Sequence, residues 1–289
     1  MLRLRWGFFY AAILPAVLVF LALVIYPLAQ VVYYSFTNYQ LTKPDLTEFV
    51  LFKQYGKLFG ESRFLMALVR SLYFSVVSVS FTLVLGYTIA ALLKRDDLKG
   101  ISFFRIIILI PMLITPLVAG AAFRYMYDFE YGIINDLLMR IGLGKIPFLS
   151  DPFWALHASI FVDIWQWTPF AVIILLAGME AMPKQPLEAA SLDGAGFWRM
   201  LFQMHLPMLR PVIGVVVLMR FIDSFREFDK VYIITAGGPG TSSETLSIYI
   251  WRQAFQYFNT GYAAAAGVIM LLIINIICVY YVKLSKTLR

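Results

Sequence analysis

Six apolar runs, each near twenty residues long, constrain this chain more than any other feature of its sequence. They lie at about residues 7–29, 71–93, 101–123, 154–178, 211–234 and 263–282. Because a helix rises about 1.5 Å per residue, roughly 20 apolar residues cross the hydrocarbon core of a bilayer. The runs therefore predict an all-α integral membrane protein with six transmembrane helices. We find no repeat or linker, so residues 1–289 are expected to form a single transmembrane domain.

The composition is typical of a membrane protein rather than a soluble one. Hydrophobic residues make up 61% of the chain and charged residues 14%, whereas soluble domains are about half apolar and a quarter charged. The formal net charge is +7, but the basic residues form no long tract, which argues against nucleic acid as a partner. The only cysteine is Cys278, so disulfides and thiolate metal clusters are excluded.

The short connections between the runs indicate the orientation. Basic residues are dense before the first run, between the second and third, between the fourth and fifth, and after the sixth: Arg3, Arg5, Lys94, Arg95, Lys99, Arg105, Lys184, Arg199, Arg210, Lys283, Lys286 and Arg289. In the opposite, longer connections acidic residues offset the basic ones. Lys and Arg accumulate on the cytoplasmic side, so both termini are predicted to be cytoplasmic. The first run is too long for a signal-peptide core and is expected to be a retained helix.

The outer segments contain further structure. Residues Phe49–Phe59 and Ile133–Ile141 mix apolar and polar side chains at helical spacing, which predicts short helices lying at the membrane interface. The segment Thr235-Ala-Gly-Gly-Pro-Gly-Thr241 predicts a turn that ends the fifth span.

The longest predicted cytoplasmic loop covers about residues 182–207. Glu188 lies in the first turn of a short helix, where the helix dipole favours an acid. The pair Asp193-Gly194 breaks this helix, and either Asp193 or Gly196 begins the next one. The loop is therefore predicted to be a helix–turn–helix.

Small residues gather at the corner of this loop. Ala189, Ala190 and Gly194 let the backbone of another protein approach closely, as a docking surface requires. The residues alone leave a second alternative open, an ordinary amphipathic connector between two spans.

The stretch Glu188-Ala-Ala-x-x-Asp-Gly-Ala195, followed by Leu206-Pro207, resembles the EAA loop of ABC importer permeases. Its fuller form is similar to the carbohydrate-uptake family that includes maltose, trehalose and glycerol-phosphate permeases. Shorter matches extend the resemblance over nearly all the chain beyond the first run: Arg105 with Pro111 and Pro116, Gly132 with Asn135, Trp165 with Pro169, Leu175–Gly178, Phe228-Asp229, Thr235–Pro239, Thr245-Leu246, Ala254-Phe255 and Gly261–Ala264. The chain departs from the family pattern at Leu51–Tyr55 and at Arg70-Ser71.

The resemblance implies the type I ABC importer permease fold in a bacterial inner membrane. It also implies four kinds of partner: a second homologous permease, usually in a heterodimer, two cytoplasmic ATPase subunits, an extracytoplasmic binding protein and the lipid bilayer. By the same analogy a coupling helix enters a cleft of the ATPase and comprises Glu188, Ala189, Ala190, Asp193, Gly194 and Ala195.

The sequence offers no site for ATP hydrolysis. A Walker A loop ends in Gly-Lys-Ser/Thr, but here Leu58 follows Gly56-Lys57 and Ile146 follows Gly144-Lys145. No HExxH or GxSxG motif and no Cys/His cluster occurs. We therefore expect no catalytic, cofactor-binding or metal-binding residues, with ATP and Mg²⁺ used by a separate ATPase subunit.

The outer half of the fifth run is rich in charge. Its candidate substrate-path residues are Arg220, Asp223, Ser224, Arg226, Glu227 and Asp229. Charges at membrane depth are costly and normally face a bundle interior or a wet cavity. One interpretation is a polar lining that binds sugar hydroxyls or forms an outer gate. The other is ion pairing along the helix, Arg220 with Asp223 and Arg226 with Asp229, which holds subunits together.

The fourth run contains Asp163-Ile-Trp-Gln-Trp-Thr-Pro169. Aromatic faces and acceptor groups suit carbohydrate binding, and for Asp163 and Trp167 we favour a place on the substrate path. For Trp165 we favour interfacial anchoring, and for Pro169 a kink eased by Thr168.

These observations predict a permease subunit that moves a disaccharide, an oligosaccharide or a related polyol or glycoside. A permease for another small solute, such as glycerol phosphate, is the alternative within this class. An ion-coupled secondary transporter would usually show inverted repeats and a longer chain. A membrane-embedded enzyme would need an acid/base or metal cluster, and the sequence supplies none.

Overall fold

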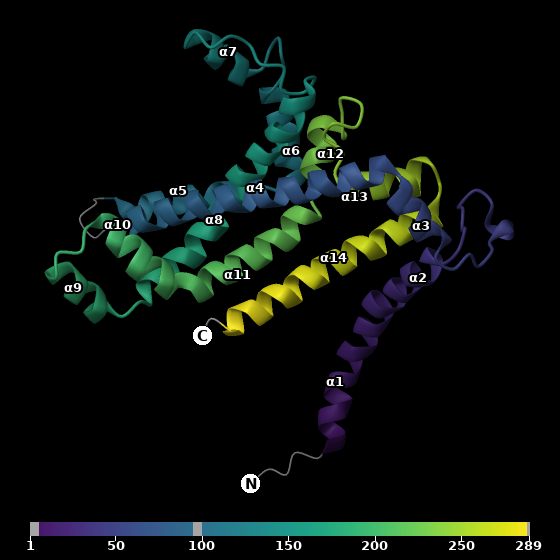
Figure 1. Ribbon diagram of the computed structural model, residues 1–289, viewed down its shortest axis with the longest axis horizontal. Coiled ribbons are helices and arrows are strands. Elements are labelled where there is room, and N and C mark those ends of the chain that lie inside the picture. The colour runs from purple at the N-terminus through teal and green to yellow at the C-terminus, as the bar shows by residue number, and fades with distance from the viewer. Residues whose placement is uncertain (1–5, 95–99, 288–289) are drawn as a thin grey trace. The chain divides into compact units, whose positions relative to one another are not determined.

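The computed structural model describes residues 6–94 and 100–287, and within these ranges the elements are helices, with one isolated bridge between Thr37 and Phe49 (Figure 1). Basic residues used above for orientation, Arg3, Arg5, Arg95, Lys99 and Arg289, lie outside the described residues. The chain divides into two compact units. The first comprises residues 1–65 and 249–273, and the second comprises residues 66–248 and 274–289.

The first unit begins with a long apolar helix. The elements of the first unit are α1 (Trp6–Phe20), η1 (Leu21–Ile25), α2 (Tyr26–Ser35), η2 (Pro44–Leu46), α3 (Lys53–Gly60), η4 (Arg252–Gln256) and the first half of α14 (Thr260–Thr287). The stretch Ala12–Ser35 is long and apolar enough to cross a membrane. Its apolar side chains are exposed within the unit, so they are available to lipid or to a partner.

The second unit contains most of the remaining helices. They are α5 (Ile101–Leu113), α6 (Pro116–Met126), α7 (Ile133–Arg140), α8 (Pro152–Glu180), α9 (Lys184–Leu192), α10 (Phe197–Arg199), η3 (Met200–His205), α11 (Leu206–Phe225) and α12 (Asp229–Thr235). Three helices begin in one unit and end in the other: α4 (Ser62–Leu93), α13 (Leu246–Trp251) and α14. Short helices are confirmed in both predicted segments: α3 begins at Lys53 rather than Phe49, and α7 covers Ile133–Arg140. Their position at the membrane interface stays a prediction.

Helix α8 lies at the centre of the second unit. Pro152 occupies its first turn, and the Asp151 carboxylate caps it by accepting from the backbone N–H groups of Phe153 (2.9 Å) and Trp154 (3.0 Å). An apolar core forms where α8 meets α4 and α11; its fully buried members are Ala90, Ala171, Leu175, Leu209 and Val216. A Cβ on Gly86 would lie 2.6 Å from the Ala171 Cβ, so glycine is what allows α4 to approach α8 this closely.

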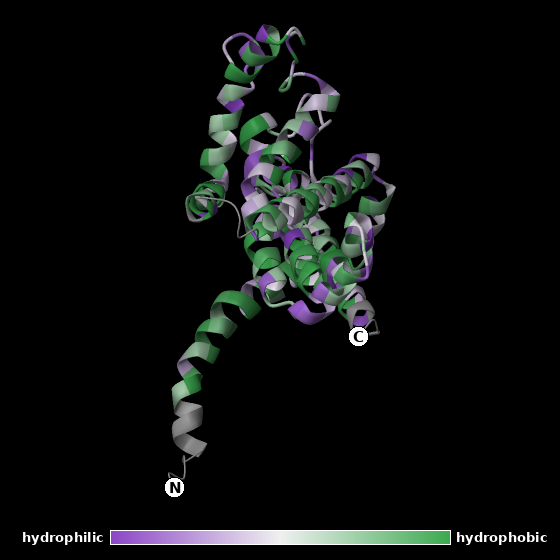
Figure 2. Cartoon of the chain, turned by 90° about the vertical axis from the view of Figure 1, so that its left-hand side faces the viewer, coloured by the Kyte–Doolittle hydropathy of each residue, from purple (hydrophilic) through white to green (hydrophobic). Residues whose placement is uncertain are grey.

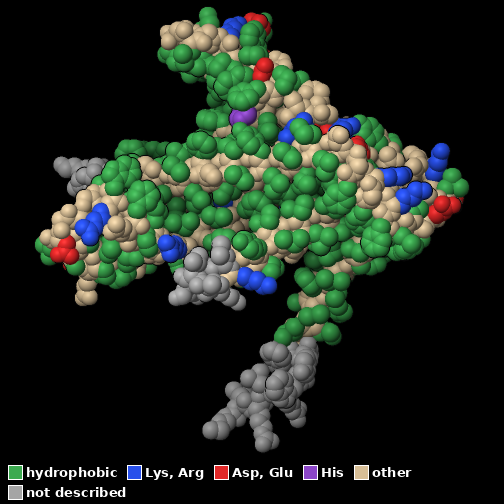
Figure 3. Space-filling view, viewed as in Figure 1, with side chains coloured by type: hydrophobic (Ala, Val, Ile, Leu, Met, Phe, Trp, Pro, Cys, Tyr) green, Lys and Arg blue, Asp and Glu red, His purple; other side chains and the backbone are tan. Residues whose placement is uncertain are grey.

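Apolar surface dominates the exterior of these helices. Figure 2 shows hydrophobic colour along most of their length, and Figure 3 shows hydrophobic side chains covering most of the visible face. Large side chains such as Leu23, Leu113 and Val84 are more than half exposed. A soluble monomer rarely exposes apolar surface on this scale, and a bilayer provides the solvent that it needs.

The candidate spans confirm the membrane class and correct two predicted helices. Among the described residues five helices qualify, at residues 12–35, 62–93, 152–180, 197–225 and 260–283, and a sixth if a bent pair counts as one span. That pair, Phe103–Leu113 and Pro116–Met126, bends by 93°, so the predicted continuous helix over 101–123 is wrong. Pro116 is the cause: it lacks an N–H donor and holds Thr115 extended (φ −64°, ψ 146°).

The predicted helix over 211–234 is also two helices. Helix α11 begins earlier, continues through Pro211 and ends at Phe225. Helix α12 then begins at Asp229, and the Glu227 carboxylate accepts a hydrogen bond from its Lys230 N–H (3.0 Å). This bond satisfies a donor that the first turn of a new helix leaves free.

Candidate functional site

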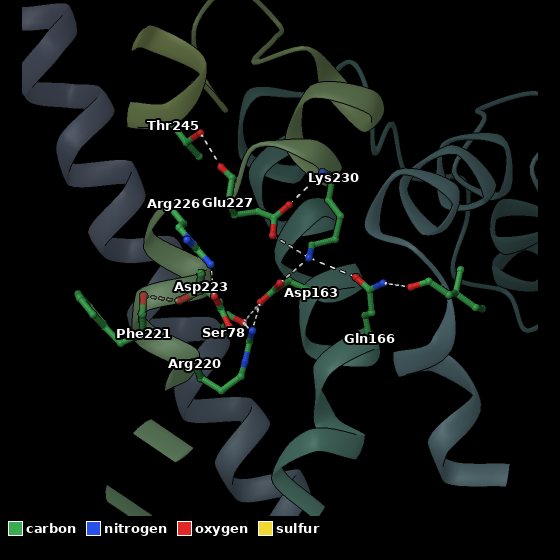
Figure 4. A network of polar contacts seen from close by, with 12 residues as sticks. Ser78, Asp163, Gln166, Arg220, Phe221, Asp223, Arg226, Glu227, Lys230 and Thr245 are labelled. Carbon is green, nitrogen blue, oxygen red and sulfur yellow. Dashed lines mark hydrogen bonds and ion pairs between the residues drawn. The ribbon is translucent and has the colours of Figure 1, made fainter. Parts of the chain in front are cut away.

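A network of charged side chains is buried inside the second unit (Figure 4). Asp163 of α8, Arg220 of α11 and Lys230 of α12 are each at most 1% exposed. The Asp163 Oδ2 atom lies 2.5 Å from Arg220 Nη2, and its Oδ1 atom lies 2.8 Å from Lys230 Nζ. The Ser78 hydroxyl on α4 donates a further hydrogen bond to Asp163. One carboxylate therefore connects four helices.

Lys230 extends the network in two directions. Its Nζ lies 2.8 Å from Glu227 Oε2 and donates to Gln166 Oε1 at 3.2 Å. The Gln166 side chain in turn donates to the backbone oxygen of Ile114 at 2.7 Å, at the break between α5 and α6. Two acids and two bases give this cluster no formal net charge. Complementary pairing of this kind offsets the desolvation of buried ions.

Arg220 retains free hydrogen-bonding capacity. Its guanidinium carbon lies 5.1 Å from the centroid of the Trp167 ring, a distance at which cation and ring attract. Its Nε and Nη1 groups are buried and find no hydrogen-bond acceptor in the described parts of the chain. Arg220 thus combines an ion pair, an aromatic face and two unused donors.

The ion pairs predicted along the fifth span are wrong. Arg220 pairs with Asp163 instead of Asp223, and Asp223 pairs with Arg226 at 2.8 Å on a largely exposed surface. Asp229 is exposed at the start of α12 and takes part in no ion pair within residues 6–94 and 100–287. Arg220 lies on the face of α11 that packs into the unit, so the acid that it meets belongs to another helix.

Other predicted residues lie around the network. Ser224 is buried, and its hydroxyl donates to the Phe221 oxygen at 3.3 Å. Trp165 packs edge-on against Phe123, with ring centroids 5.0 Å apart. Helix α8 continues through Pro169, and the Thr168 hydroxyl donates to the Ile164 oxygen at 2.6 Å.

Three members of the network were absent from the predicted site: Ser78, Gln166 and Lys230. A signal for Ser78 was present in the sequence, because Ser71, Ser75, Ser78 and Thr82 recur at helical spacing and all four are buried in α4. Gln166 is one turn from Asp163, which places both on one face of α8. Lys230 had no comparable signal, because the break before α12 decides where its side chain points.

The predicted coupling loop forms a helix and a sharp corner. Helix α9 holds Glu188, Ala189 and Ala190, and none of its residues is buried. Asp193 ends it, Gly194 adopts a left-handed conformation (φ +76°), and Gly196 begins α10. A Cβ on Gly194 would meet no atom within 4 Å, so the backbone angle, not crowding, is what requires glycine there.

Apolar side chains surround that corner. Leu192 is 89% exposed, Phe197 72% and Trp198 67%. The corner therefore presents exposed apolar surface close to the charged Glu188 side chain.

The chain is similar to known transport proteins. A family model described as "Binding-protein-dependent transport system inner membrane component" matches residues 83–288. The chain is 32% identical over 273 residues to the sulfoquinovosyl glycerol transport system permease protein SmoG of Agrobacterium fabrum, covering 94% of this chain and 88% of that protein. It is 31% identical over 280 residues to the trehalose/maltose transport system permease protein MalF of Thermococcus litoralis, covering 96% and 93%.

A solved structure shares the fold. It is a bacterial alginate ABC transporter in complex with an alginate pentasaccharide-bound periplasmic protein, with a TM-score of 0.83, 24% identity, and coverage of 97% of this chain and 94% of that one. The family match, residues 83–288, includes the predicted coupling loop and the network residues of α8, α11 and α12, while Ser78 precedes it.

Proposed function

This chain belongs to the family of binding-protein-dependent transport system inner membrane components, and from that premise we propose that it is the permease subunit of an ABC importer for a sugar. Relatives named for sulfoquinovosyl glycerol and for trehalose or maltose support a glycoside, disaccharide or oligosaccharide as the solute. Glycerol phosphate is the alternative solute. The family match favours an ATP-driven importer over an ion-coupled carrier.

The exposed corner at α9 is the observation that carries the mechanism. This cytoplasmic loop forms a surface suited to a partner cleft, because it combines a left-handed glycine, small side chains and exposed apolar groups. Glu188 would meet a basic residue there, and partial desolvation would strengthen the pair beyond the value of a surface ion pair. Closure of two ATPase subunits on ATP and Mg²⁺ would then move α9 and the spans that it connects.

The remaining partners and the orientation follow from the same proposal. A second homologous permease completes the pathway, and an extracytoplasmic binding protein delivers the solute. The solved alginate transporter, which is in complex with a pentasaccharide-bound periplasmic protein, supports this. Both termini lie on the cytoplasmic side of a bacterial inner membrane. The exposed apolar helix at residues 12–35 supports contact with lipid or with the second permease.

The buried network is proposed to hold the spans together and to meet the solute when they separate. Asp163 connects α4, α8, α11 and α12, so movement of any one of these helices must break or exchange an ion pair. Arg220 has two unused donors beside the Trp167 ring. A sugar offers hydroxyl acceptors to the Arg220 donors and an apolar face to the Trp167 ring. Asp223 and Arg226 lie on exposed surface beside the network.

The test of this function is a reconstituted complex with a matched pair of glycine variants. Gly194→Trp is expected to reduce the retained ATPase subunit, or binding-protein-stimulated ATP hydrolysis, by about tenfold, as the loss of roughly 1.4 kcal/mol of docking energy does. Gly142→Trp is the control, because Gly142 is also left-handed (φ +80°) with no atom near its Cβ position. Normal subunit content together with normal stimulation in Gly194→Trp would show that α9 is not the docking element.

A further inference from the structure

A polar pocket of about 380 Å³ lies within the first unit. Three parts of the chain form it: the segment after α2, the helix α3 with the residue that follows it, and the segment from η4 to the start of α14. The nine lining residues all carry polar side chains: Asn38, Tyr39, Gln40, Gln54, Lys57, Glu61, Gln253, Asn259 and Tyr262. The volume falls within the range of small-molecule sites.

Backbone contacts fix the walls of this pocket. The Gly261 N–H donates to the Tyr39 oxygen at 2.8 Å, and the Leu41 N–H donates to the Phe258 oxygen at 3.2 Å. A Cβ on Gly261 would lie 2.4 Å from the Thr37 oxygen, so only glycine allows the two segments to meet this closely. The pocket is therefore preorganised.

A carboxylate and two phenols form a fixed polar group at the pocket. Glu61 accepts hydrogen bonds from the Tyr249 hydroxyl at 2.8 Å and from the Tyr262 hydroxyl. Burial, with the hydrogen bonds to Tyr262 and Glu61, raises the pKa of the Tyr249 hydroxyl. Tyr249 is thus a neutral donor at physiological pH, and it holds the Glu61 carboxylate in place.

Gln253 is the side chain that points to a ligand. It is only 7% exposed, yet its amide has no hydrogen-bond partner in the portion of the chain that the structure describes. Gln54 is equally buried, and its amide N–H donates a hydrogen bond to the Thr37 backbone oxygen at 3.0 Å. Gln253 lines the pocket, so its amide donors and acceptor are available to a ligand there.

We infer that this pocket binds a neutral, polyhydroxylated solute of about one sugar ring. Five of its side chains are amides, which offer donors and acceptors together, as paired hydroxyl groups require. Its single Lys and single Glu leave no net charge to attract a phosphate or a sulfonate. The inference rests on the proposed function, because that orientation puts the end of α2 and the start of α14 on the outer side, where solute arrives.

The experiment measures equilibrium binding to the intact complex in lipid nanodiscs, without the binding protein. The probes are trehalose, maltose, glycerol and glycerol 3-phosphate. Gln253→Ala is expected to weaken trehalose or maltose binding roughly two- to tenfold, the value of one hydrogen bond. Gln40→Trp, at an exposed position, is expected to fill the pocket and abolish this binding without disturbing the fold. Gln256→Ala is the matched control, since Gln256 is exposed in the same helical turn and does not line the pocket.

Three results would overturn the inference. The first is no sugar binding, or binding equal in wild type, Gln253→Ala and Gln40→Trp. The second is preference for glycerol 3-phosphate. The third comes from a second assay in which the binding protein is added to the same samples: loss of stimulated ATP hydrolysis in both variants, with sugar binding unchanged, would make the pocket a protein contact. ATPase retention in the same samples separates these results from failure of the proposed function, because it depends on α9 and not on the pocket.

Discussion

The charge network of the second unit and the polar pocket of the first unit both bury polar side chains, but they satisfy them differently. In the network Asp163 meets Arg220 and Lys230, and Lys230 also meets Glu227. In the pocket Gln253 is nearly as well shielded and its amide has no partner within the described residues. Charged groups that pair with one another stabilise a fold. Donors left unused, at Arg220 Nε and Nη1 in the network and at Gln253 in the pocket, are available to a ligand.

The largest effect is expected from removing the hub of the network. Asp163→Ala would leave Arg220 buried without a counter-ion, which costs about 3–5 kcal/mol. Thermal unfolding in detergent, or the folded fraction by size exclusion, measures this loss. An unfolding temperature equal to that of wild type would show that the network does not stabilise the unit.

The double variant Asp163→Leu/Arg220→Met sharpens the comparison. Replacing both partners by apolar residues removes the uncompensated charge, so stability is expected to recover by about 1–4 kcal/mol relative to Asp163→Ala. Lys230 keeps Glu227 as its partner in this variant. We expect sugar uptake to remain impaired despite normal assembly, because the Arg220 donors are absent. Restored uptake would assign the pair a structural role alone.

A smaller effect on stability is expected in the pocket. Gln253→Ala removes no intramolecular side-chain hydrogen bond, so the free energy of unfolding is expected to change by less than about 1 kcal/mol. The same unfolding assay, run beside Gln54→Ala, checks this. Gln54→Ala is expected to be the more destabilising, since it leaves the Thr37 oxygen unpaired. The reverse order would show that Gln253 serves the fold.

The smallest effect is expected for the exposed pair near the network. Arg226→Ala breaks a 2.8 Å contact with Asp223, but the side chains are 61% and 38% exposed. Surface pairs of this kind contribute about 0–1 kcal/mol. An unfolding temperature close to wild type, with little dependence on salt, is the expected result. A loss like that of Asp163→Ala would mean that burial does not distinguish the two pairs.

Several features of this protein were determined by the sequence alone. Apolar runs of about twenty residues follow directly from bilayer thickness, so they predicted the membrane class. The residues of the EAA loop, in their order along the chain, identified the family. Asp193-Gly194 predicted the end of α9, because a left-handed residue that ends a helix is a local requirement.

Tertiary structure alone decided which charges meet and which segments form the pocket. Helical spacing predicted Arg220 with Asp223, three residues away, but the acid that it contacts is 57 residues away on α8. Gln253 lines one pocket with Asn38 and Gln54, which lie some two hundred positions earlier in the chain. Local periodicity tells which side chains share a face of one helix. What that face meets after the Pro116 break, at the end of α11 at Phe225 and at the close approach at Gly261 depends on how separate helices pack, which local periodicity does not contain.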